Sequence, residues 1–79
     1  MDWKQHIDVN PDVLAGKPVI KGTRVSVELI LDRLGDGWTH EDLLAAYPRV
    51  SLEALQAVFA FAAEILRDEE YVARGKIEA

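Results

Sequence analysis

The chain has 79 residues, no cysteine and a formal net charge of −5. A domain of this size has a small core, and without cysteine neither disulfides nor a thiolate zinc site can reinforce it, so helix packing, often supplemented by oligomerisation, must supply the stability. Because no apolar run is long enough to span a bilayer and Met1–Lys4 lacks a signal-peptide pattern, we expect a cytoplasmic protein without membrane association.

The charge is unevenly distributed along the chain. Residues 1–24 carry four cations and three acids, whereas residues 25–79 carry five cations and eleven acids. A protein that binds DNA with its own surface usually has a basic face, and the acidic helical part of this chain would repel the DNA phosphates. We therefore expect any DNA binding by the chain alone to be weak.

Residues 5–24 predict a short β arm. Ile7–Val9 alternates apolar and polar residues, and Val19-Ile20 is a β-branched pair between a proline and a glycine turn. These two runs are expected to pair as a small ribbon. Val13–Ala15 predicts a single helical turn between them, ending at Gly16.

Residues 25–70 predict a helical body that begins with two short helices. The first is expected at Ser26–Leu34, with a serine cap at its start and apolar residues at i, i+3, i+4 and i+7. The second starts at Thr39, with Asp42 as its capping-box partner, and Pro48 ends it.

The third helix is predicted to begin at Ser51 and to run through Leu66 toward Glu70. The core stripe is assigned to Leu52, Leu55, Val58, Phe59, Ala62, Ile65 and Leu66. The flank of this helix is apolar as well, which leaves two interpretations open. In the first, the helix is an ordinary core helix wrapped by the β arm. In the second, the flank is a self-association face, which predicts a homodimer with its interface at Ala57, Ala60, Phe61 and Glu64.

The stretch from Asn10 to Val25 carries a family resemblance. It begins with Asn-Pro, and after four intervening residues it continues as Gly-Lys-Pro-Val-Ile-Lys-Gly-Thr-Arg-Val. Val-Glu-Leu-Ile-Leu follows this stretch, and Tyr-Pro comes later in the chain. This pattern resembles the DUF433 family from about Ile7 to Ile65, with Asn10 where Asp is expected. The resemblance implies a small bacterial protein, mainly α, with a three-helix homeodomain-like fold of helix-turn-helix type and a short N-terminal β arm, as one domain over 1–79. It further implies an antitoxin paired with a PIN-like ribonuclease toxin.

The residue pattern does not indicate a catalytic function. The chain lacks a cysteine nucleophile, no serine stands in a recognisable motif with histidine, and its two histidines lack metal-ligand spacing. The acids lie at spacings typical of solubilising helix surfaces. We expect a non-enzymatic binding module with no metal and no cofactor.

The candidate partner-binding residues are cations near a turn and on the tail. If the partner is a PIN-like ribonuclease, arginine suits its carboxylate cluster because the guanidinium pairs bidentately. The candidates are Lys21 and Arg24 at the turn into the first helix, and Tyr71 and Arg74 in the tail, residues 71–79. The competing interpretation is that Thr23 and Arg24 hydrogen-bond the junction and serve the fold.

Two alternatives to the antitoxin remain open. One is a DNA-binding transcriptional regulator, whose expected contacts with DNA are Lys17, Lys21 and Arg24. Its recognition helix would be the third, whose first two turns offer one glutamine, Gln56, an acid, Glu53, and no cation. The other alternative is a homodimeric structural protein.

Overall fold

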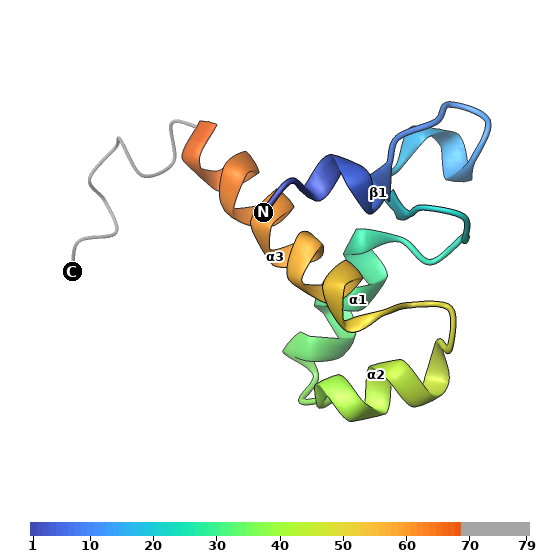
Figure 1. Ribbon diagram of the computed structural model, residues 1–79, viewed down its shortest axis with the longest axis vertical. Helices are drawn as coiled ribbons and strands as arrows, with labels where there is room; N and C mark the ends of the chain where they lie inside the picture. The colour runs from blue at the N-terminus through green and yellow to red at the C-terminus, as the bar shows by residue number, and fades with distance from the viewer. Residues whose placement is uncertain (69–79) are drawn as a thin grey trace.

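The computed structural model describes residues 1–68, in which three helices surround a small core and a β arm lies across one side (Figure 1). This arrangement confirms the mainly α fold with a short N-terminal β arm. In chain order the elements are η1 (Trp3–Gln5), β1 (Ile7–Asp8), η2 (Leu14–Gly16), β2 (Val19–Ile20), α1 (Val27–Gly35), α2 (His40–Ala46) and α3 (Leu52–Asp68).

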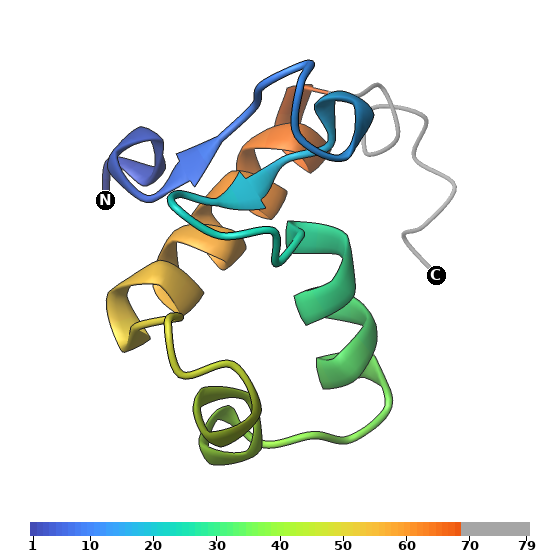
Figure 2. The ribbon, with the colours of Figure 1, turned by 90° about the vertical axis from the view of Figure 1, so that its right-hand side faces the viewer.

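The β arm is an antiparallel pair. Ile7 lies opposite Ile20, and a further bridge joins Val19 to Ser26, so the chain leaving β2 folds back on it before α1 starts. Figure 2 shows the arm crossing α3, and both η1 and β1 contact that helix. The arm therefore contributes core residues, because Ile7, Val19 and Ile20 are all buried.

The connection between the strands differs from the helical turn predicted at Val13–Ala15. Leu14, Ala15 and Gly16 all have positive φ, of 47°, 56° and 86°, so the short η2 turn is left-handed. The glycine adopts this conformation freely, whereas the two side-chain-bearing residues are strained by it. A sequence pattern that indicates a turn does not reveal its hand.

Ala15→Gly should stabilise the protein. Relief of the left-handed strain outweighs the greater freedom of glycine in the unfolded chain, which gives a net gain of about 0.5–1 kcal/mol in the free energy of unfolding. Urea denaturation followed by circular dichroism measures it. As the matched control, Ala45→Gly on exposed α2 should lose about 1 kcal/mol, since glycine is disfavoured in a helix. A loss at both positions would contradict the left-handed turn.

The two short helices begin as predicted. Ser26 Oγ accepts a hydrogen bond from the Leu29 N–H at 2.9 Å. The capping box of α2 is complete, because the Asp42 N–H donates to Thr39 Oγ1 at 3.0 Å and the Thr39 N–H donates to Asp42 Oδ2 at 2.9 Å. The backbone and side-chain hydrogen bonds from Thr39 lower the pKa of Asp42. These bonds fix the direction in which α2 leaves the loop after α1.

The burial of α3 differs from the predicted stripe. Ala54, Leu55, Ala57 and Val58 are buried, whereas Leu52, Phe59, Ile65 and Leu66, all assigned to the core, are 44–54% exposed. The β arm causes this difference, because it covers the side of α3 that carries the alanines, and small side chains allow it to approach closely. With apolar residues on two sides, the periodicity alone did not identify the inner one.

The predicted dimer interface on α3 needs correction for the same reason. Ala57 is fully buried within the chain, so its assignment to an interface is wrong. Phe61 is partly buried and packs edge-to-face on Trp3, with ring centroids 4.7 Å apart. Glu64 is exposed and accepts a hydrogen bond from Trp3 Nε1 at 3.1 Å, while Ala60 is partly buried. This face of α3 therefore holds the N-terminal turn of the same chain.

The expectation of no membrane association bears on the helices of the structure, since a helix must be long and apolar to span a bilayer. Within residues 1–68, none of the helices has the length and hydropathy needed to cross a bilayer.

Candidate functional site

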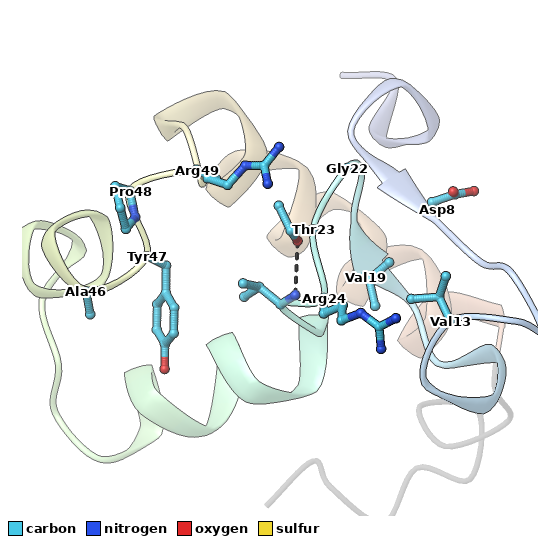
Figure 3. A pocket seen from close by; sticks show the side chains of 11 residues that line it. Asp8, Val13, Val19, Gly22, Thr23, Arg24, Ala46, Tyr47, Pro48 and Arg49 are labelled. Carbon is cyan, nitrogen blue, oxygen red and sulfur yellow. Dashed lines mark hydrogen bonds between the residues drawn. The ribbon is translucent and has the colours of Figure 1, made fainter.

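A groove of about 700 Å³ lies between the turn that follows β2 and the turn that follows α2 (Figure 3). Residues 22–25 form one wall and residues 46–49 the other, and the β arm adds Asp8, Val13 and Val19. We call this concavity the arginine groove, because Arg24 and Arg49 both line it. It brings together two stretches that lie more than twenty residues apart in the sequence.

The first wall is a rigid turn. Thr23 Oγ1 donates to the Ile20 carbonyl at 2.7 Å and accepts from the Val25 N–H at 3.0 Å. The Ile20 N–H also donates to the Val25 carbonyl at 2.9 Å, which closes the loop. Gly22 occupies a left-handed position in it, with φ of 80°. The hydroxyl of Thr23 therefore serves the fold.

Arg24 is the side chain that this turn presents. It is exposed, and among residues 1–68 its guanidinium has no hydrogen-bond or ion-pair partner. In Figure 3 it extends from the turn on the side of Val13. The prediction that both Thr23 and Arg24 bond the junction is thus correct for Thr23 only, and Arg24 is available to a ligand.

Arg49 lies on the opposite wall and was not among the predicted site residues. The Val50 N–H donates to the Tyr47 carbonyl at 2.9 Å, so residues 47–50 form a tight turn with Pro48 and Arg49 at its centre. Tyr47 stacks on Trp38, with ring centroids 6.4 Å apart, and Val50 is buried. Both ends of the turn are anchored, and Arg49 is exposed. The available signal was its position directly after the Tyr-Pro pair of the family pattern.

The predicted lysines do not join the two arginines. Lys17 Nζ forms an ion pair with Glu28 at 3.0 Å, and Lys21 Nζ donates to the Lys4 carbonyl at 3.3 Å. Neither lines the groove. Of the cation set proposed for DNA, Lys17 and Lys21 are thus engaged with other groups of the chain, and Arg24 is the member that lines the groove. Tyr71 and Arg74 lie outside the described residues.

The chemistry of the groove is that of a cationic recognition surface. Its walls are mainly apolar, with Tyr47 and Pro48 among them, and Asp8 is its single acid. In the part of the chain that the structure covers, no group of three or more His, Asp or Glu side chains could hold a metal ion. Two guanidinium groups suit a carboxylate-bearing surface, because each can pair bidentately with a carboxylate, and the backbone turns that carry them are held in place before binding.

Comparison with known proteins gives two matches. The model of the family described as "Protein of unknown function (DUF433)" matches residues 7–62. The fold is similar to the crystal structure of a DUF433 member protein from Anabaena variabilis ATCC 29413, with a TM-score of 0.71 and 28% sequence identity. The match covers 87% of this chain and 65% of that one, so this chain spans slightly less than two thirds of that protein's length. No curated protein matches the sequence.

Proposed function

This chain belongs to the DUF433 family, and we propose that it is a binding module that blocks a PIN-like ribonuclease by placing Arg24 and Arg49 against the enzyme's carboxylates. The observation that carries the proposal is that two exposed arginines, from two separately anchored turns, line one groove. The module would act as the antitoxin of a toxin–antitoxin pair.

The chemistry of the partner explains why arginines suit this task. A PIN-like active site is a cluster of carboxylates that hold divalent metal, and it is strongly anionic when the metal is absent. A guanidinium can take the place of the metal, since it pairs bidentately with a carboxylate and stays charged at every relevant pH. Two of them, carried on opposite walls, can engage two carboxylates of the cluster.

The groove also accounts for the acidic surface of the rest of the chain. Residues 25–79 carry eleven acids, which would repel the active-site carboxylates if any helix approached them. The arginine groove carries two cations and one acid, so the attraction of its charges would favour its approach to the target over that of the acidic helices. Contacts with the apolar walls would then supply most of the affinity.

The proposal predicts that the reading frame next to that of this chain encodes a PIN-type ribonuclease, and the test uses that enzyme. Arg24→Ala should leave the helical circular dichroism spectrum unchanged and weaken inhibition of the enzyme by about 10- to 100-fold, as expected for the loss of a charge-assisted pair. Arg49→Ala should have a similar effect. Lys4→Ala, which removes an exposed cation outside the groove, is the matched control and should inhibit like the wild type.

Three outcomes would contradict the proposal. The first is an Arg24→Ala protein that is folded and inhibits fully. The second is an inhibitory loss confined to Arg74→Ala, which would locate the contact on the tail. The third is tight, salt-resistant binding to promoter DNA by the chain alone, since a body this acidic should bind duplex DNA only at ~10⁻⁴–10⁻⁶ M and lose it with added salt.

A further inference from the structure

The outer face of α3 carries an apolar stripe that the rest of residues 1–68 leaves exposed. Leu52, Phe59 and Leu66 are 50%, 44% and 54% exposed, and they follow one another at seven-residue intervals. Gln56 and Ala63, both exposed, lie between them at the alternate four- and three-residue steps. This is the spacing with which one helix packs along another. The start of α2 borders the stripe, where the His40 ring lies 6.1 Å from that of Phe59.

We infer that this stripe binds a second copy of the same chain, with the two α3 helices antiparallel. A two-fold axis near residues 60–61 would place Phe59 of each copy beside the small Ala63 of the other. The same axis would place Glu53 beside the other copy's Arg67, and both of these side chains are exposed. Each contact occurs twice, as a self-complementary interface requires.

The charges along the stripe select the antiparallel orientation. In a parallel pair, each Glu53 would lie at the same level as the other copy's Glu53 but on the opposite side of the interface, and the two arginines likewise, so no acid would meet a cation. In the antiparallel pair the acid at the start of each helix meets the cation at the end of the other, a complementarity of the kind that fixes helix orientation. The face opposite the stripe is occupied, because Phe61 and Glu64 contact Trp3.

Sedimentation equilibrium of the full chain tests the association. The wild type should be dimeric at ~100 μM, since one helix per copy is a small interface with an expected dissociation constant in the micromolar range. Phe59→Glu should weaken the dimer about 100-fold, because it introduces two carboxylates at the centre of the interface. Val9→Glu, at an exposed apolar residue outside the stripe, is the control and should remain dimeric. A monomeric wild type, or a Phe59→Glu protein as dimeric as the wild type, would overturn the inference.

Disulfide trapping tests the orientation, since the chain has no cysteine of its own. Oxidation of a mixture of Glu53→Cys and Arg67→Cys proteins should yield mainly the mixed dimer. Gln56→Cys alone should not cross-link, because in the antiparallel pair the two copies of this residue lie about 15 Å apart along the axis. Efficient self-linking of Gln56→Cys would indicate a parallel pair and overturn the antiparallel assignment.

Discussion

Reversing both charges of the arginine groove, by Arg24→Glu with Arg49→Glu, should abolish inhibition of the PIN-type ribonuclease. Each substitution removes an attraction and adds a repulsion beside a carboxylate cluster, and like charges brought together at an interface cost several kcal/mol. We expect binding to weaken by at least ~10³-fold, equivalent to about 4 kcal/mol. Isothermal titration calorimetry against the enzyme measures this loss, and activity on a fluorogenic RNA reports release of inhibition.

The fold should tolerate the double reversal, because both side chains are exposed and the two turns are held by other groups. Thr23 and backbone bonds close one turn, and the Tyr47–Val50 bond closes the other. Arg24→Lys with Arg49→Lys provides the graded control. This variant keeps both positive charges but lacks the planar guanidinium that pairs bidentately with a carboxylate. We therefore expect it to inhibit more weakly than the wild type but far more strongly than the glutamate variant. Equal inhibition by the glutamate and wild-type proteins would rule out the groove as the contact surface.

Local chemistry made much of the fold predictable from the sequence. The caps at Ser26 and Thr39 use hydrogen bonds between residues three apart, so their signal lies within one helical turn of chain. The same holds for the strand pair, whose β-branched and alternating residues are bounded by turn residues. Such elements were located to within one or two residues because nothing distant decides them.

The inner face of α3 and the second arginine were not predictable in this way. Which side of α3 is buried depends on the β arm, some fifty residues earlier in the chain, and alanines on one side competed with larger residues on the other. Arg49 becomes a groove residue only when α1 and α2 bring its turn opposite residues 22–25. Arg24 was identified because it follows a glycine turn, a local signal. Arg49 follows the Tyr-Pro pair, but that local signal does not reveal which residues lie across the groove.

Phe61 and Phe59 lie on the inner and outer sides of α3, so the same substitution at each position shows which side the fold depends on. Phe61→Glu should destabilise the fold severely. The Phe61 ring packs on Trp3 at 4.7 Å, and Trp3 also donates to Glu64, so this contact fastens the N-terminal turn to α3. A carboxylate there loses the aromatic contact and lies one turn from Glu64, a like charge. We expect a loss of roughly 3 kcal/mol in the free energy of unfolding.

Loss of this contact should extend to the β arm, because η1 leads directly into β1 and the buried Ile7. A loss of 3 kcal/mol lowers the melting temperature of a domain this small by roughly 12–24 °C. Phe59→Glu is the matched comparison, the same substitution two residues earlier on the exposed side. Measured at ~1 μM, where weak dimers have dissociated, it should melt within about 3 °C of the wild type. A Phe61→Glu protein that melts normally and fails only to dimerise would mean that the interface lies on the Trp3 side of α3, and that the arm does not depend on this contact.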